Sequence, residues 1–247
     1  MKDGILIIDK PEGISSAKTV FKIKKVLNLS KAGHTGTLDP FATGILVICL
    51  DNTTKKAVFF SNLDKTYLGT MILGISTDTQ DLTGKVIKVN TRKNYRLSAD
   101  EIKSVFKMFH GEIWQTPPMF SAIKSKGKPV YLLARKGIQI KLIPRKVKIF
   151  QLNLLDARWD RYPSISFKVQ CSKGTYIRTL CNDIGEYLGY GAYMSNLRRI
   201  QVGKIALKQA IPLNKFIKLP FEKQKKHILP FDKILNYIST KEEEVYS

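Results

Sequence analysis

Short apolar runs, each bounded by turn residues, are the feature that most limits the folds open to this chain. None of them approaches the ~20 residues that a membrane-spanning helix needs, and the most strongly apolar stretch covers only 45–50. Runs typical of strands are mixed with stretches of helical spacing, without the regular strand–helix–strand order of a parallel sheet. We therefore predict an α+β fold with a mixed, mainly antiparallel sheet flanked by helices.

The expected strands are unevenly spaced along the chain. They fall at 5–9, 44–50, 67–73, 85–89, 145–158, 164–171 and 193–200. Residues 31–43 hold two glycines, a proline and several polar turn formers, and predict a loop before a buried strand. A helix should fill the stretch that ends near 188, where glycines follow.

Two further helices are expected from capping residues. Ser15 or Ser16 should cap the first, whose apolar residues recur at helical spacing. These are Val20, Phe21, Ile23, Val26 and Leu27. Ser98 and Glu101 form a capping box for the second helix, which should end near Gly111.

The charge of the chain predicts a polyanionic partner. Lys and Arg total 42 against 20 Asp and Glu, a formal net charge of +22. Residues 113–155 contain no acidic side chain, and aromatic residues stand among their basic ones. The basic residues of this stretch are Lys124, Lys126, Lys128, Arg135, Lys136, Lys141, Arg145, Lys146 and Lys148. A solvated Lys-rich face would explain the charge alone, but the acid-free, aromatic-containing stretch favours RNA or DNA.

Several common chemistries lack their residues here. Cys49, Cys171 and Cys181 are too dispersed for a disulfide framework or a thiolate zinc site, so we expect three buried thiols. The three histidines lie far apart, and neither a P-loop, a nucleophile elbow nor a dinucleotide-binding glycine pattern is present. We expect no metal and no cofactor. Without an export signal or an amphipathic basic helix, we also expect a cytoplasmic protein that does not bind membranes.

The loop GHTGTLDPFATG, at 33–44, is the strongest candidate for chemistry. Pro40 pushes the backbone of Asp39 toward an extended conformation, and the glycines of the loop permit a sharp bend. A lone carboxylate on such a loop suits a nucleophile or a base, although Asp-Pro is more often a plain turn.

This loop resembles the catalytic loop of the TruB family of tRNA pseudouridine synthases, which isomerise uridine 55 in the T-arm of tRNA. The resemblance continues in the family's order through DKTYLGTMILG (64–74), STDTQDLTG (76–84), QTPPMFSAIKSKGKPVYLLARKG (115–137), CSKGTYIRTLCNDIGEYLG (171–189) and GAYMSNLRRIQVG (191–203). It covers nearly all of 5–203 and implies the pseudouridine synthase fold.

The resemblance implies three catalytic residues. Asp39 matches the essential nucleophile, and Tyr67 matches a tyrosine that stacks on the target base and moves a proton. Arg178 matches an arginine that pairs with the aspartate, and such a pair holds a carboxylate ionised. Attack at C1′, addition at C6 and a glycal route all stay open. Without the resemblance, Tyr67 would be read as a core aromatic and Arg178 as a surface residue.

Four substrate-binding residues follow from the same resemblance. His34 matches a histidine linked to extruding the uridine or filling its place, and Leu197 matches an apolar wall of the uracil pocket. Lys65 and Arg199 are expected to contact phosphate. Read alone, His34 would be a loop packing residue and Leu197 ordinary core.

The implied partner is the T-arm stem-loop of tRNA, with the target uridine flipped out of its stack. The reaction needs no cofactor, and nothing in the sequence indicates an obligate protein partner, so we expect a monomer. Two alternatives remain: a non-catalytic RNA-binding or tRNA-chaperone protein that kept the fold, and another RNA enzyme such as a deaminase or methyltransferase. The missing zinc ligands and glycine loop disfavour the second alternative.

The expected organisation is one catalytic domain at 1–211 and a short tail at 212–247. The catalytic domain would carry an RNA-clamping insertion at about 115–145, of the kind found in the stand-alone bacterial type. Bacterial relatives usually carry a C-terminal RNA-binding appendage of the PUA type. We expect that appendage to be absent or truncated here.

Overall fold

The computed structural model describes residues 3–91, 97–121, 123–125, 128–134, 136–138 and 140–234. They form two compact units: unit 1 comprises Met1–Tyr67 with Arg198–Ser247, and unit 2 comprises Leu68–Leu197. The division falls within two strands, β4 (Lys65–Leu73) and β12 (Ala192–Val202). The last part of the predicted tail (212–247), residues 235–247, lies outside the described residues.

The sheet of unit 1 is built on two long apolar strands. β1 (Gly4–Lys10) pairs antiparallel with β3 (Thr43–Leu50), with Ile7 opposite Val47. The short strand β14 (Ile211–Pro212) pairs parallel with β1, and β2 (Ala32–His34) and the end of β12 pair with β3. β13 (Ile205–Ala206) pairs antiparallel with the end of β12. β1 and β3 read as almost continuous apolar runs because both of their faces are buried.

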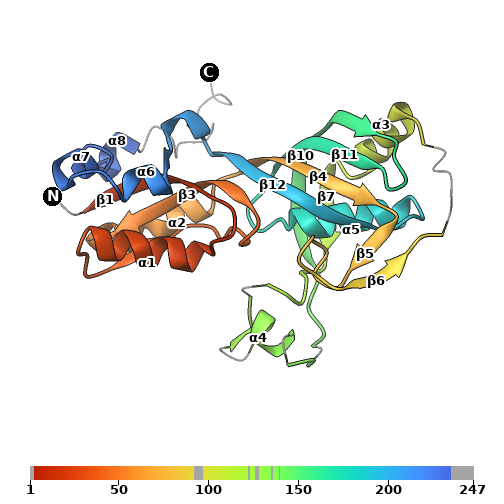
Figure 1. The fold of residues 1–247 in the computed structure, drawn as a ribbon, viewed down its shortest axis with the longest axis horizontal. Coiled ribbons are helices and arrows are strands. Elements are labelled where there is room, and N and C mark those ends of the chain that lie inside the picture. The colour runs from red at the N-terminus through yellow and green to blue at the C-terminus, as the bar shows by residue number, and fades with distance from the viewer. Residues whose placement is uncertain are drawn as a thin grey trace, which may run out of the picture. The chain divides into compact units, whose positions relative to one another are not determined.

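Helices cover both faces of this sheet (Figure 1). Leu6 and Ile8 of β1 pack in one core cluster with Ile23 of α1 (Ser16–Val26), and the alternate residues of β1 pack with Phe60 of α2 (Ala57–Ser61). This follows from the two-residue period of a strand. The other elements of unit 1 are η1 (Asp51–Lys56), η2 (Leu207–Gln209), α6 (Leu213–Phe216), α7 (Phe221–Lys225) and α8 (Phe231–Ile234).

The predicted helix at Ser15 or Ser16 is confirmed, but its apolar stripe is only partly buried. Ser15 is the N-cap, and its hydroxyl accepts a hydrogen bond from the Lys18 N–H at 3.2 Å. Ile23 is fully buried, whereas Phe21 is 67% exposed. The helical spacing of the apolar residues therefore does not bury Phe21. One side of the helix faces the sheet, and Phe21 lies on the other.

Unit 2 contains an antiparallel group of strands. Its strand order is β12, β4, β11 (Ser164–Cys171), β10 (Arg145–Arg158) and β7 (Gly111–Gln115). A separate hairpin pairs β5 (Ile75–Thr77) with β6 (Val86–Val89). The predicted strands are therefore present, and the predicted α+β class with a mainly antiparallel sheet is confirmed. One short strand, β2, lies in the predicted loop at 31–43.

Besides α4 of the connection described below, the helices α3 and α5 accompany the strands of unit 2. The predicted capping box begins α3 (Ala99–Met108): the Glu101 N–H donates to the Ser98 hydroxyl, and the Ser98 N–H donates to the Glu101 carboxylate. The Phe106 ring of α3 packs edge to face against the Phe167 ring of β11, with the ring centres 6.2 Å apart. The second helix, α5 (Ile177–Tyr187), is the one predicted before the glycines near 188. None of the helices described here combines the length and the apolar character that crossing a bilayer requires.

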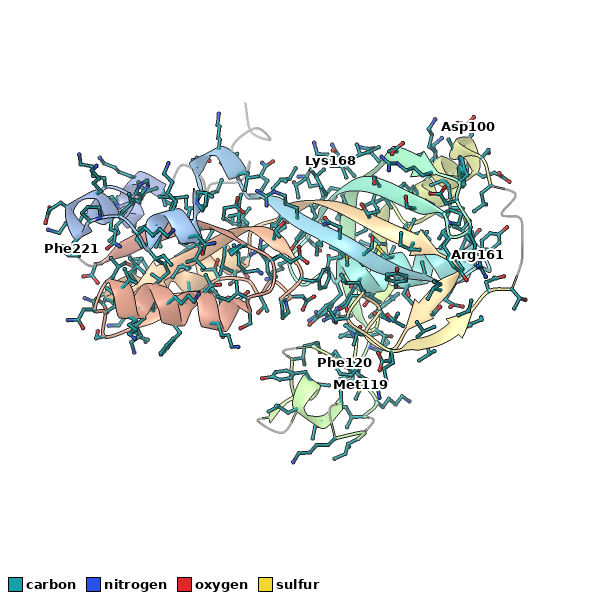
Figure 2. The ribbon with its side chains drawn as sticks, viewed as in Figure 1. Asp100, Met119, Phe120, Arg161, Lys168 and Phe221 are labelled. Atoms are coloured by element: carbon teal, nitrogen blue, oxygen red, sulfur yellow. The ribbon has the colours of Figure 1, made fainter. Side chains whose placement is uncertain are left out.

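Residues 116–144, which connect β7 to β10, form what we call the inserted segment. They contain the hairpin of β8 (Lys124–Ser125) and β9 (Lys128–Pro129), followed by α4 (Val130–Ala134). Met119 and Phe120 lie near its start (Figure 2). The insertion predicted at about 115–145 corresponds to this connection. Two of its basic residues, Lys126 and Arg135, lie outside the described residues.

Candidate active site

The loop that carries Asp39 is pinned to unit 1 on both sides of the carboxylate. The Leu38 N–H donates to the buried Ser16 hydroxyl at 2.8 Å, and that hydroxyl donates to the Leu38 carbonyl at 2.9 Å. After Asp39, the Gly13 N–H donates to the Pro40 carbonyl, and the Ala42 N–H donates to the Asp39 carbonyl. The half-buried Asp39 therefore projects from a backbone whose polar groups are already paired.

A buried ammonium, that of Lys10, lies close to this loop. Lys10 ends β1, is fully buried, and donates to the carbonyls of Pro11, Ile14 and Pro40 at 2.9, 2.8 and 3.2 Å. Burial lowers the pKa of Lys10 to about 8, and the attraction of the Asp39 carboxylate opposes that effect. The sequence reasoning missed this residue. The available signal was a lysine at the end of a mostly apolar strand, where burial forces a lysine to find partners.

Arg199 fastens the same loop at two points. It is 2% exposed, and its guanidinium donates to the Gly36 carbonyl at 3.0 Å and to the Ile45 carbonyl at 2.7 Å. At Gly44 the backbone φ is +102°, and a Cβ there would lie 2.2 Å from the Arg199 carbonyl oxygen. Glycine is therefore required at this point of close approach.

Lys65 and Arg199, for which phosphate contacts are predicted, are both buried and bonded to backbone. Lys65 is 7% exposed and donates to the carbonyls of Ser61, at 2.7 Å, and Leu63. Arg199 is buried among loop carbonyls as described above. Both cations hold backbone in this structure, and their phosphate contacts stay a prediction.

His34 ends β2 with its imidazole half-buried. Its Nδ1 is buried and has no hydrogen-bond partner among the described residues. Burial, and to a smaller extent the charge of Arg199, lower the pKa of His34. The ring is therefore neutral at neutral pH, with one nitrogen still able to bond a ligand.

Tyr67 and Leu197 are both buried, at 8% and 6% exposure. Tyr67 belongs to β4 and Leu197 to β12. Burial is what a core residue and a pocket wall have in common, so their predicted roles at the uracil stay predictions.

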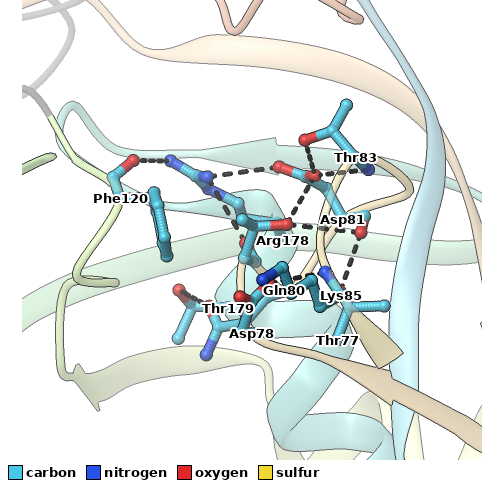
Figure 3. Close-up of polar contacts among 10 residues, drawn as sticks. Thr77, Asp78, Gln80, Asp81, Thr83, Lys85, Phe120, Arg178 and Thr179 are labelled. Atoms are coloured by element: carbon cyan, nitrogen blue, oxygen red, sulfur yellow. Dashed lines mark hydrogen bonds and ion pairs between the residues drawn. The ribbon is translucent and has the colours of Figure 1, made fainter. Parts of the chain in front are cut away.

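In unit 2, Arg178 lies in the first turn of α5 and is 4% exposed. The alternative interpretation of Arg178 as a surface residue, which applied without the family resemblance, is therefore wrong. Its guanidinium lies 3.2 Å from the Asp81 carboxylate and donates to the carbonyls of Phe120, at 2.7 Å, and Thr79, at 3.4 Å (Figure 3). A buried arginine with partners on several sides has little freedom to change its position.

Asp81, which sequence reasoning did not single out, is the anchor of this cluster. Its Oδ1 accepts hydrogen bonds from the Thr79 hydroxyl, the Thr83 N–H and the Thr83 hydroxyl at 2.7, 2.9 and 2.6 Å (Figure 3). The signal was the density of Thr and Asp in 76–84, because these side chains bond nearby backbone and each other in turns. The loop thus presents a fixed carboxylate to Arg178. The predicted pairing of Arg178 with Asp39 joins the two units and stays a prediction.

Metal and thiol chemistry find little support in the part of the chain that the structure describes. No group of three His, Cys, Asp or Glu side chains lies where it could hold a metal ion there. All three cysteines are buried thiols outside any disulfide, as predicted. Burial raises the pKa of Cys49 to about 12 and also raises that of Cys181, so neither is a ready nucleophile at neutral pH.

Comparison with known proteins identifies relatives over most of the chain. The TruB family pseudouridylate synthase N-terminal domain matches residues 24–177, and the tRNA pseudouridylate synthase B C-terminal domain matches 178–236. The tRNA pseudouridine synthase B of Aquifex aeolicus is 43% identical over 236 residues, covering 96% of this chain and 80% of that protein. That of Clostridium kluyveri is 46% identical over 233 residues, covering 94% and 78%.

Solved structures resemble the chain as well. A Cbf5–Nop10–Gar1 complex contains a chain that is 30% identical, with a TM-score of 0.73. An H/ACA ribonucleoprotein bound to a substrate RNA containing 2′-deoxyuridine contains one that is 28% identical, with a TM-score of 0.70. Each match covers 96% of the present chain and 62% of the other.

Proposed function

This chain belongs to the TruB family of pseudouridylate synthases, and we propose that it converts uridine 55 in the T-arm of tRNA to pseudouridine. Its curated relatives are named tRNA pseudouridine synthase B. The position of the uridine is what the resemblance of the sequence blocks to this family implies. We further propose that the chain acts in the cytoplasm as a monomer, without an obligate protein partner.

The geometry of the Asp39 loop carries this proposal. The reaction breaks the N1–C1′ bond, joins C5 to C1′, releases the proton of C5 and protonates N1. A carboxylate can act as nucleophile or base in such a sequence only if it is held in position and stays ionised. The loop carbonyls around Asp39 are paired, and a buried ammonium lies close to its carboxylate.

The proposed roles of the other residues complete the site. Arg178 would pair with Asp39, Tyr67 would stack on the flipped base and move a proton, and Leu197 would form an apolar wall. His34 would bond the RNA at the position that the uridine leaves. Its neutral imidazole with an unpartnered nitrogen supports that role. Flipping costs a few kcal/mol, which phosphate contacts from exposed lysines would offset.

The test is tritium release from a T-arm stem-loop labelled with [5-³H]uridine, because C5 loses its hydrogen only when the new bond forms. The wild-type chain should release tritium, and Asp39→Ala should release none while it still binds the RNA. Asp100→Asn, which alters a side chain that is 88% exposed on α3, is the control and should match the wild type. A wild-type chain that is inactive on both the hairpin and full tRNA, or an active Asp39→Ala, would contradict the proposal.

A further inference from the structure

The inserted segment leaves and rejoins unit 2 at a single pair of residues. Gln115 ends β7, Arg145 begins β10, and the two are register partners across the strands. We call these two residues the base of the inserted segment. Both side chains reach the same stretch of chain, 174–176, which leads into α5. The base therefore contacts the residues just before Arg178.

Gln115 bonds the backbone of Tyr176 twice. Its side-chain N–H donates to the Tyr176 carbonyl at 3.0 Å, and its side-chain oxygen accepts from the Tyr176 N–H at 2.7 Å. Gln115 is 1% exposed, so water offers no ready substitute for these bonds. Tyr176 is the N-cap of α5 and makes no side-chain capping bond. The start of this helix is thus held by the amide of Gln115.

Arg145 and Phe120 add contacts from the same segment and its base. The Arg145 guanidinium donates to the Gly174 carbonyl at 2.7 Å and lies 5.0 Å from the centre of the Tyr176 ring. Phe120, inside the segment (Figure 2), accepts a hydrogen bond from the Arg178 guanidinium through its carbonyl oxygen at 2.7 Å. The base of the segment therefore contacts the helix start that carries Arg178, and the segment itself contacts the guanidinium through Phe120.

We propose that Gln115 is a positioning residue for Arg178, and that through it the base of the inserted segment sets where the guanidinium lies. This inference rests on the proposed function, in which Arg178 acts at the reacting carboxylate. Tyr176 lies two residues before Arg178, so a shift of its backbone moves the arginine with it. A displacement of about 1 Å can slow a reaction roughly 100-fold.

The test measures the single-turnover rate of pseudouridine formation at saturating T-arm RNA, together with the Kd for the RNA. Gln115→Leu removes both bonds to Tyr176 and keeps a similar volume. We expect the rate to fall about 10- to 100-fold, while the Kd stays within about twofold. Gln115→Glu keeps the bond from the Tyr176 N–H and loses the one to its carbonyl, so its rate should lie in between. If Gln115→Leu does not fold, the rate of Gln115→Glu alone tests the inference.

Gln224→Leu is the matched control. Gln224 is 3% exposed in α7 of unit 1 and donates to the Phe216 carbonyl at 3.2 Å. It is thus a second buried glutamine that bonds backbone, but it belongs to unit 1, whereas α5 belongs to unit 2. Its substitution should lower stability and leave the single-turnover rate unchanged.

A double-mutant cycle with Arg178→Lys separates positioning from general structural damage. If Gln115 acts through the arginine, Gln115→Leu should slow the Arg178→Lys variant by less than about twofold. A folded Gln115→Leu with the wild-type rate, or a full and additive loss in the Arg178→Lys background, would overturn the inference alone. An inactive wild-type chain would overturn the proposed function, and the inference with it.

Discussion

Two buried cations beside the Asp39 loop are explained by the carbonyl groups around them. Lys10 and Arg199 together donate hydrogen bonds to five backbone carbonyls, those of residues 11, 14, 36, 40 and 45. Glycine- and proline-rich loops leave such carbonyls unpaired, and a buried carbonyl without a donor is costly. Both cations therefore hold the loop in shape, and Lys10 also supplies positive charge near Asp39.

The stability of the fold should depend on pH through Lys10. Its pKa in the folded chain is lowered to about 8, whereas in the unfolded chain it is near the model-peptide value of about 10.4. Between these values the unfolded chain binds more protons, so the contribution of Lys10 to stability should rise from pH 8 to about 10.4 and then level off. Urea unfolding of the wild type and of Lys10→Met, at pH 7.5 and 9.5, isolates this contribution.

Only the wild type should gain stability from Lys10 on going to the higher pH, since methionine does not titrate. Other groups that titrate in this range affect both proteins and cancel in the comparison. An equal change in the two proteins would contradict the assignment of a lowered pKa to this lysine.

At the scale of elements, close approaches of backbone decide which substitutions the loop and strands tolerate. β3 and β12 meet where Thr43 and Gly44 pair with Arg198 and Arg199. The strands approach so closely there that any side chain at Gly44 would enter the Arg199 backbone. The spacing of the glycines in the sequence marks the loop, but only the pairing of these strands shows which glycine is indispensable.

Gly44→Ala should therefore be far more damaging than Gly13→Ala. Both glycines have a positive φ, +102° and +81°, so alanine at either should cost about 1–2 kcal/mol from backbone strain. At Gly13 a Cβ meets nothing within 4 Å, whereas at Gly44 it would lie 2.2 Å from a carbonyl oxygen. We expect Gly44→Ala to lower the free energy of unfolding by more than about 2 kcal/mol beyond the loss caused by Gly13→Ala.

Chemical denaturation of the two alanine variants makes this comparison directly. Equal losses of unfolding free energy would show that the approach of β12 to Gly44 does not limit the residue at that position.

At the scale of the whole molecule, the excess of basic residues is the property that matters for RNA. Many of these side chains are exposed, among them Lys136 and Lys141 in the inserted segment and Lys146 and Lys148 on β10. Lys10, Lys65 and Arg199 are buried, so the count of basic residues overstates what a phosphate backbone can meet. The exposed lysines of the inserted segment are the better candidates for phosphate contacts.

Binding of the T-arm RNA should weaken steeply as salt rises. Each phosphate that a lysine neutralises contributes about 0.7 to 0.9 to the slope of log affinity against log salt. Replacing both Lys136 and Lys141 by alanine should reduce that slope by about 1.4 to 1.8, if both contact phosphate. Fluorescence anisotropy from 50 to about 300 mM salt measures it.

Lys103→Ala is the control for this series, because Lys103 is already paired with Asp100 on α3 at 2.9 Å. Its slope should equal that of the wild type. A wild-type slope near zero would contradict phosphate contacts as the source of affinity.

The sequence alone determined the features that depend on neighbours along the chain. The strand and helix positions, the capping box of Ser98 and Glu101 and the family blocks that contain Asp39 and Arg178 could all be read from it, because propensity, capping and motif order are local. The tertiary structure decided which polar side chains meet. The amide of Gln115 bonds Tyr176 61 residues away, Asp81 holds Arg178 across 97 residues, and Arg199 reaches Gly36 across 163. No local pattern encodes such partners. They depend on which carbonyls and charged groups become buried when the chain folds, because buried polar groups require hydrogen-bond or charge partners.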